Sequence, residues 1–332
     1  MSWDAATGAI ASYYDKRAER ELLGGPGALP LVLEDWDDTW GHRIVAYDRE
    51  VGRFANPAFA SLEEGPLRGR IQVRTSYGGS FVVQDCALHR GSPALDCRVT
   101  VDWHERYKVL KIAFPTVLRA GELTAAVPYG FVTRRMDGAE EPVSGWVDLS
   151  GKDGHGSFGI ALLSPSKCSY SAKDGEIRLT VLHSPAWSHH NPAVVGEGDG
   201  YRYMEQGVHE FDYRLVPHAG DWRTAEVARL VEGDTAPLVA LVTTNHGGEW
   251  PRERALVRLT APHVAVSALK LGEDGDVLVA RLVELEGAPT RGTIELPPLG
   301  SAKVEMKPNE IRTLLFPLAG GRPVREASLL EE

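Results

Sequence analysis

A period of two residues dominates the hydrophobic pattern of this 332-residue chain. Apolar and polar side chains alternate along many short segments, and this alternation is typical of strands with one buried face. With 35 glycines and 21 prolines the chain has many turn formers, which favours numerous short strands over long helices. The segments with this pattern before residue 220 are 71–75, 95–101, 109–114, 123–133, 159–163, 177–182 and 209–216.

A second series of strands is predicted after a short helical stretch. Residues 222–232 have the apolar spacing of an amphipathic helix, with Asp221 as the expected N-cap and Gly233 as the expected stop. The later strands follow one another about every 8–14 residues, the spacing of a small antiparallel sandwich. They are predicted at 238–243, 255–260, 264–269, 277–285, 292–296, 303–306 and 311–317.

These patterns define an all-β fold in two parts. We expect a large antiparallel domain at residues 1–220, a short helix and linker at 221–237, a C-terminal β-sandwich at 238–320 and a frayed tail at 321–332.

Charge and composition exclude several classes of function. The formal net charge of −10 has the wrong sign for a nucleic-acid or anionic-membrane surface. No apolar run approaches a membrane span, and the N-terminal residues lack the apolar region of a signal peptide. We therefore expect a cytoplasmic protein with no nucleic-acid or membrane partner.

The three cysteines are too scattered for a disulfide framework or a zinc site. Cys86 and Cys97 could pair across strands, but we expect buried free thiols, as is usual in a reducing compartment.

Several blocks of sequence resemble one enzyme family. Residues 101–115 read VDWHERYKVLKIAFP, which is similar to the "VDWHERHKLLKVAFP" pattern of glycoside hydrolase family 38 α-mannosidases. The most specific block is QGVHEFDYRLVPHAGDW at residues 206–222, and others follow in the same order along the chain. The resemblance implies a mutarotase-like β-supersandwich followed by a β-sandwich, the region downstream of the catalytic domain in that family.

The same resemblance sets the functional expectation. The family's zinc site and aspartate nucleophile lie in an N-terminal catalytic domain, so no cofactor, metal ligand or catalytic residue is expected in this chain. Its implied partner is a catalytic α-mannosidase domain, in cis or in trans, which it would brace while shaping the sugar cleft for mannose metabolism. Alternatives are a free-standing carbohydrate-binding or mutarotase-like protein, or a decayed copy that only self-associates as a homo-oligomer. An enzymatic activity of its own therefore stays uncertain.

Acidic pairs and histidines give no clear catalytic or metal site. Glu140 and Glu141 are expected to be solvated loop charges rather than a glycosidase pair. His189 and His190 are neighbours on an extended segment, so their rings should point apart and not share one ion. A mutarotase would need a histidine base and a glutamate, for which His104 and Glu210 are the sheet-borne candidates.

The segment 184–208 is the best candidate for contact with sugar. It is long, rich in glycine and proline and interleaved with aromatic residues, and aromatic faces bind the C–H patches of sugars. In the family that the chain resembles, the corresponding loop lies beside the mouth of the active site, and Gln206 and Gly207 fall nearest to that position. The expected substrate-binding residues are Trp187, Tyr201, Tyr203, Gln206 and Gly207.

Overall fold

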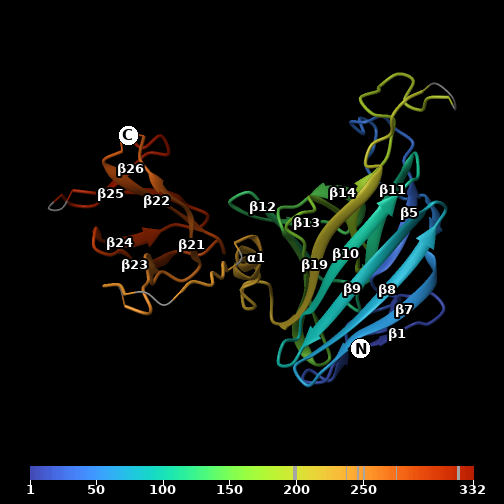
Figure 1. Ribbon diagram of the computed structural model, residues 1–332, viewed down its shortest axis with the longest axis horizontal. Coiled ribbons are helices and arrows are strands. Elements are labelled where there is room, and N and C mark those ends of the chain that lie inside the picture. Colours follow the sequence, from blue (N-terminus) through green and yellow to red (C-terminus); the bar gives the residue numbers. More distant parts are fainter. Residues whose placement is uncertain (197–199, 237, 245–246, 250, 274, 320–321) are drawn as a thin grey trace. The chain divides into compact units, whose positions relative to one another are not determined.

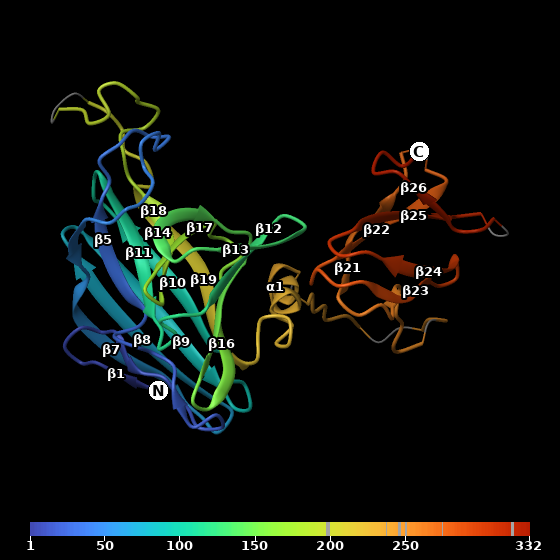
Figure 2. The same cartoon turned by 180° about the vertical axis from the view of Figure 1, so that it is seen from behind.

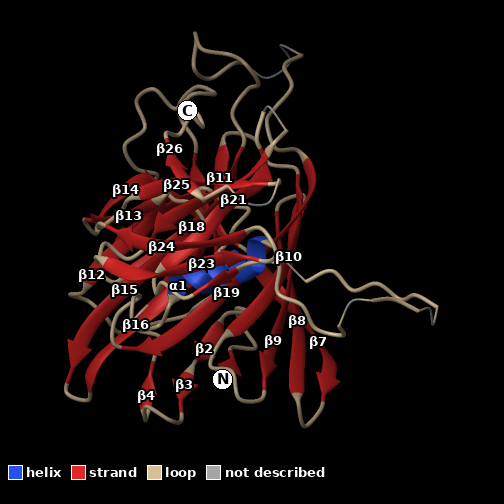
Figure 3. Ribbon diagram, turned by 90° about the vertical axis from the view of Figure 1, so that its left-hand side faces the viewer, coloured by secondary structure: helices blue, strands red, loops and turns tan. Residues whose placement is uncertain are grey.

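The computed structural model describes residues 1–332 except 197–199, 237, 245–246, 250, 274 and 320–321. It divides into two compact units. The first comprises Met1–Ala126 and Val132–Ala236, and the second comprises Val127–Phe131 and Pro237–Glu332. The described residues form strands and one α-helix, which confirms the all-β fold class (Figure 3). No helix in these described ranges is long and apolar enough to cross a membrane.

The first unit is built from two large sheets (Figures 1 and 2). In spatial order the nine-stranded sheet is β13 (Gly130–Arg134), β12 (Glu122–Val127), β15 (Trp146–Asp153), β16 (Gly156–Leu163), β19 (Gly207–Ala219), β10 (Leu95–Trp103), β9 (Ser80–His89), β8 (Arg68–Tyr77) and β7 (Ala55–Glu64). The six-stranded sheet is β14 (Asp137–Pro142), β17 (Ser169–Lys173), β18 (Glu176–His183), β11 (Lys108–Pro115), β5 (Leu29–Glu34) and β6 (Glu50–Arg53). Two short pairs join β1 (Ser2–Trp3) to β2 (Ile10–Ser12) and β3 (Tyr14–Asp15) to β4 (Arg20–Glu21).

The core of the first unit lies between these sheets. Val82 and Val99 of the larger sheet are fully buried in the same cluster as Ile112 and Leu179 of the smaller one. Strands β9 and β10 alternate buried and partly exposed residues, as the period-two pattern predicts. Strand β11 is buried on both faces, because a second apolar cluster with Leu31 covers the outer side of its sheet.

The single helix of the described residues, α1, spans Val227–Thr235 and ends the first unit. It begins five residues later than expected. Asp221 caps a preceding turn instead, accepting a hydrogen bond from the Thr224 N–H at 3.0 Å. Gly233, expected as the stop, lies inside the helix. Val231 of the helix packs so closely on Gly145 (φ +95°) that a Cβ there would come within 2.8 Å of its side chain.

The second unit contains a three-stranded sheet and a four-stranded sheet. The first has the order β20 (Arg258–Leu259), β23 (Thr290–Leu296) and β24 (Gly300–Met306). The second has the order β21 (Val264–Leu271), β22 (Val277–Glu284), β25 (Ile311–Pro317) and β26 (Arg325–Ala327). Their apolar faces share one core, in which Ile294 and Phe316 are fully buried. These two sheets therefore form a small sandwich with its own core.

Several segments differ from the sequence-based expectation, among them the following three. Residues 123–133 form two strands, because the chain turns at Tyr129, which has a left-handed φ of 61°. Residues 238–243 form no strand, and Leu238 and Val242 are fully exposed. Residues 325–327, expected in a frayed tail, pair with β25 as β26.

Cys86 and Cys97 form a disulfide, contrary to the expected free thiols. They lie opposite each other on β9 and β10, with Cα atoms 4.2 Å apart. The register of the two strands therefore places both sulfurs on the buried face, within bonding reach. Cys168 is exposed and is a free thiol.

Candidate functional site

Two loops meet at one end of the first unit. Loop A, residues 184–206, joins β18 to β19, and loop B, residues 35–49, joins β5 to β6. In Figures 1 and 2 the described parts of loop A, in yellow, project beyond the ends of the sheets, next to the blue loop B. A pair of backbone hydrogen bonds closes the base of loop A, from Trp187 N–H to Arg202 O and from Met204 N–H to Pro185 O. We call the segments 184–187 and 202–206, which these bonds hold together, the stem of loop A.

The aromatic residues expected to bind sugar lie in this loop. Trp187 is 55% exposed, so its ring is available to a ligand. Tyr201 packs against His189, with ring centroids 4.7 Å apart. Tyr203 packs edge-on against Tyr107 at 5.4 Å, and the Arg106 guanidinium lies over its ring. Tyr201 and Tyr203 thus pack against different residues, although both lie in loop A.

Gln206 and Gly207 have structural contacts in the described chain. The Gln206 side-chain amide donates to Glu105 O at 2.8 Å and to Met204 O at 3.0 Å. Gly207 is the first residue of β19, opposite Trp103 of β10, and its φ of +101° is one that glycine adopts readily. Gln206 therefore has only its carbonyl oxygen left for a sugar hydroxyl without breaking a bond.

Loop B brings three buried acids to the same place. Asp35, Asp37 and Asp38 are each at most 2% exposed. Asp37 binds Arg43 through two side-chain hydrogen bonds of 3.0 and 2.7 Å. Burial alone would raise the pKa of Asp37, but the bonds from Arg43 hold that pKa below its usual value. Asp35 has a raised pKa because burial dominates over His183, whose Nδ1 lies 3.3 Å away.

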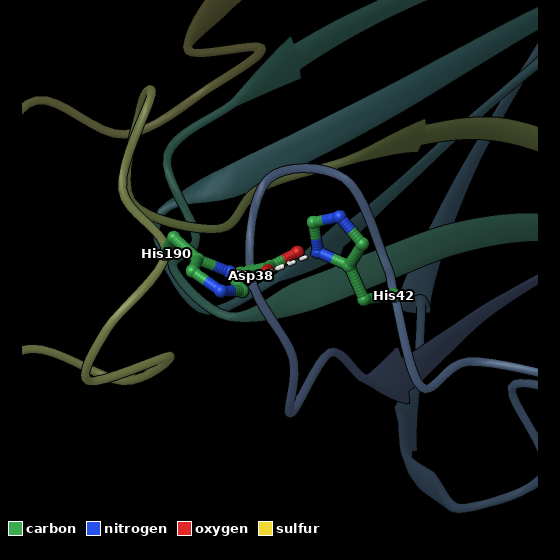
Figure 4. A group of neighbouring side chains, drawn as sticks. All are labelled: Asp38, His42 and His190. Atoms are coloured by element: carbon green, nitrogen blue, oxygen red, sulfur yellow. Dashed lines mark hydrogen bonds and ion pairs between the residues drawn. The ribbon is translucent and has the colours of Figure 1, made fainter.

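Asp38 joins the two loops through a pair of histidines (Figure 4). His42 of loop B places its Nδ1 2.7 Å from Asp38 Oδ2. His190 of loop A places its Nδ1 within hydrogen-bond reach of the same oxygen. The other carboxylate oxygen accepts the Trp40 N–H at 2.9 Å. Burial would raise the pKa of Asp38, yet these hydrogen bonds together lower it well below its usual range.

Sequence reasoning missed Asp38 and His42 and considered His190 only beside His189. The rings of His189 and His190 contact different partners, but His190 meets a carboxylate that lies 152 residues earlier in the chain. No spacing rule connects positions so far apart. The available signal was the local run Asp37-Asp38-Thr39-Trp40-Gly41-His42, which places a carboxylate and an imidazole four residues apart.

The other sequence candidates are separated from one another. His104 binds Asp102 at 2.9 Å, whereas Glu210 faces Arg98 at 3.6 Å, so they do not form a mutarotase pair. The expectation that Glu140 is a solvated loop charge is wrong. Glu140 lies on β14 with its side chain 16% exposed, paired with the fully buried Lys111. A pocket of about 380 Å³ near this pair is lined by Tyr47, Arg119, Ser171 and Arg178, among others.

Comparison with known proteins decides the family. The family model "Glycosyl hydrolases family 38 C-terminal domain" matches residues 1–191, more than half of the chain. The chain belongs to glycoside hydrolase family 38. Alpha-mannosidase G of Dictyostelium discoideum is 28% identical over 313 residues, covering 86% of this chain and 26% of that protein. Alpha-mannosidase 2C1 of Mus musculus is 27% identical over 277 residues, covering 78% of this chain and 24% of that protein. The chain thus spans about a quarter of the length of these curated relatives.

Solved structures show the same fold. An α-mannosidase from Enterococcus faecalis V583 superposes with a TM-score of 0.74 at 15% identity, covering 93% of this chain and 40% of that one. A second family 38 protein from Enterococcus faecalis superposes with a TM-score of 0.72 at 15% identity, covering 91% of this chain and 41% of that one. This family 38 chain therefore shares its fold with parts of these two longer chains.

Proposed function

We propose that this chain acts as the C-terminal β region of an α-mannosidase-like glycoside hydrolase. In that role it braces a catalytic domain and shapes one side of the sugar cleft. The observation that carries the proposal is the family 38 C-terminal match over residues 1–191. The mannosidase names of the relatives, of which this chain spans about a quarter, supply the reaction class.

The loop end of the first unit is the part of the molecule best suited to meet sugar. It exposes Trp187 at 55% and Trp40 at 60%, and aromatic faces of this kind stack on the apolar patches of sugar rings. Buried acids and exposed imidazoles beside them offer hydrogen-bond partners for hydroxyl groups. Carbohydrate contact by Trp187, Tyr201 and Tyr203 is therefore part of this proposal.

We also propose that these 332 residues do not hydrolyse mannosides on their own. The test is turnover of an aryl α-mannoside by pure protein, with and without added zinc, against a mock purification. No turnover above the mock is expected, because the region matched is the C-terminal domain. Clear turnover that co-purifies with the chain would overturn this part of the proposal.

The sugar contact is tested by calorimetric titration with mannose and mannobiose. Binding should be weak, near millimolar and thus about −4 kcal/mol, because one wall of a cleft covers little of a ligand. The double variant Trp187→Ala with Tyr203→Ala should lose measurable binding. The control variant Tyr14→Ala with Tyr129→Ala removes two rings, 46% and 53% exposed, from other places. The control variant should bind as the wild type does. Unchanged binding in the loop variant would place the sugar elsewhere, for example at the pocket beside Tyr47.

A further inference from the structure

Asp38, His42 and His190 form the one group of three or more potential metal ligands found among the described residues. One ligand atom from each lies within 4.8 Å of the others. The carboxylate is 1% exposed, whereas the two histidine side chains are 55% and 65% exposed. The group is thus a buried carboxylate that lies between two accessible imidazoles (Figure 4).

The shared carboxylate separates this group from the other acid–histidine pairs of the chain. Asp102–His104 and Asp148–His218 each join one acid to one histidine. At Asp38, two imidazole rings from different loops contact the same carboxylate oxygen. The ring centroids are 4.9 Å apart and the angle between the ring planes is 70°. The two imidazole nitrogens and the carboxylate oxygen that both contact would supply three of the four ligands of a tetrahedral site.

Charge balance also favours a cation at this place. Arg43 forms an ion pair with Asp37 and acts on Asp38 only electrostatically, whereas the Asp38 carboxylate contacts the Trp40 N–H and the two histidines directly. A buried carboxylate needs compensation, and histidine supplies a positive charge only when it is protonated. A divalent cation would supply the charge with both imidazoles neutral.

The geometry requires only a small adjustment to admit an ion. Ligands about 2.1 Å from a tetrahedral zinc lie roughly 3.4 Å from one another. The His42 Nδ1 to Asp38 Oδ2 distance is now 2.7 Å, so these two atoms must separate by less than 1 Å. The ligand atoms of all three residues, now within 4.8 Å of one another, must reach about the same spacing. The exposed rings can make this movement. Each Nδ1 proton can move to the Nε2 of the same ring, which leaves Nδ1 as the ligand atom.

We infer that Asp38, His42 and His190 bind one divalent transition-metal ion of the zinc class, which ties loop A to loop B. Two imidazoles and a carboxylate suit zinc, cobalt and nickel better than magnesium or calcium, which prefer oxygen ligands. Three protein ligands leave a coordination position for water or for a hydroxyl group of a ligand. This inference rests on the side-chain geometry and is independent of the proposed mannosidase role.

The experiment titrates the metal-stripped full chain with zinc by calorimetry, and with cobalt by visible absorption. The expected result is one ion per chain with a micromolar or tighter dissociation constant. His42→Gln and His190→Gln should each weaken binding about tenfold or more, since each removes one ligand. Both rings are exposed, so both variants should fold, and circular dichroism melting curves verify this.

His104→Gln is the matched control, because His104 is also about half exposed and also binds an aspartate. This variant should bind zinc as the wild type does. Absence of zinc uptake by the wild type would overturn the inference. Equal affinity in the His42→Gln, His190→Gln and wild-type chains would do so too, because the ion would then be bound elsewhere.

Discussion

The hydroxyl group of Thr39 donates a hydrogen bond to the backbone oxygen of Ala186, at 2.6 Å and across 147 residues of sequence. The same oxygen atom of Thr39 accepts the His189 N–H at 3.3 Å, and the Thr39 N–H reaches His189 O at 3.4 Å. Thr39 therefore connects loop B to the stem of loop A. This connection is what places Asp38 and His42 beside His190.

Thr39→Val should loosen this connection without changing the volume of the side chain much. Loss of the hydroxyl removes one donor and one acceptor, each worth about 1 kcal/mol. We expect the backbone amides of residues 186–190 to exchange hydrogen about fivefold to thirtyfold faster, measured by mass spectrometry. Thr39→Ser keeps the hydroxyl and should exchange like the wild type. Equal exchange in the valine and serine variants would contradict the role of the hydroxyl.

Local pattern predicted much of the fold. The alternation of apolar and polar residues at 95–101 predicted β10, because successive side chains of a strand face the core and solvent in turn. Residues 238–243 have an equally apolar pattern but form no strand, since a strand also needs a neighbour to pair with. Tyr129 ended a predicted strand through a left-handed backbone that tyrosine seldom adopts, so its sequence gave little warning.

The candidate site was only half predictable. Loop A drew attention through its length and aromatic residues, which are local properties. Its partner Asp38 could not be found in the same way, because the pairing of His190 with Asp38 depends on how β5 and β18 lie in one sheet with β11 between them. Convergence of distant loops is a property of topology and not of spacing.

The Cys86–Cys97 disulfide leads to a prediction about thiol content. Under denaturing, non-reducing conditions, alkylation should label one cysteine per chain, Cys168, and reduction should raise the number to three. Cys86→Ser with Cys97→Ser should lower the free energy of unfolding by about 2–3 kcal/mol, the range for a loop of this length. Cys168→Ser is the control and should change stability little. Three labelled cysteines before reduction would show that the thiols are free.

The disulfide also bears on where the protein works. Disulfides persist in oxidising compartments and are rare in the cytosol. The pair between β9 and β10 therefore opposes the cytoplasmic location expected from composition. Trapping thiols with an alkylating reagent in intact cells tests this, because protein from an oxidising compartment should again label at Cys168 alone.

The fully buried Lys111 pairs with Glu140, which is 16% exposed, and disruption of this pair should be costly. Lys111 is fully buried and donates to Glu140 and, at 2.8 Å, to Ser171. Burial lowers the pKa of Lys111, although the Glu140 carboxylate opposes that shift. Glu140→Gln leaves the ammonium without a countercharge, so the free energy of unfolding should fall by about 3–5 kcal/mol.

Denaturant titration of the double variant Lys111→Met with Glu140→Gln measures how much of this loss comes from the unpaired charge. The double variant should be more stable than Glu140→Gln alone, since no uncompensated ammonium remains. Glu141→Gln is the matched control. Glu141 Oε2 lies 3.1 Å from Arg134 Nη1, and both side chains are 27% exposed. Removing the Glu141 charge should therefore cost only about 1 kcal/mol or less. Equal losses in the Glu140 and Glu141 variants would refute the special role of the Lys111–Glu140 pair.

Glu21 should give the stability a distinct acid dependence. Its carboxylate accepts hydrogen bonds from the Ser12 hydroxyl and from the Tyr13, Leu22 and Leu23 N–H groups. Burial would raise the pKa of Glu21, but these four bonds outweigh it, so the pKa in the folded chain lies below the unfolded value.

Because the folded pKa is the lower one, the charged form stabilises the fold. This contribution is fully present above the unfolded pKa of about 4.3 and is lost as the pH falls through the folded pKa. Glu21→Gln should therefore reduce the free energy of unfolding by about 1–2 kcal/mol at pH 7. The difference from wild type should shrink steadily as the pH is lowered from about 5 to 3, in urea titrations at each pH. Glu122→Gln, at the exposed start of β12, is the control and should show a small difference at every pH. A Glu21→Gln deficit that stays constant down to the lowest pH would mean that the loss comes from packing and not from the ionised carboxylate.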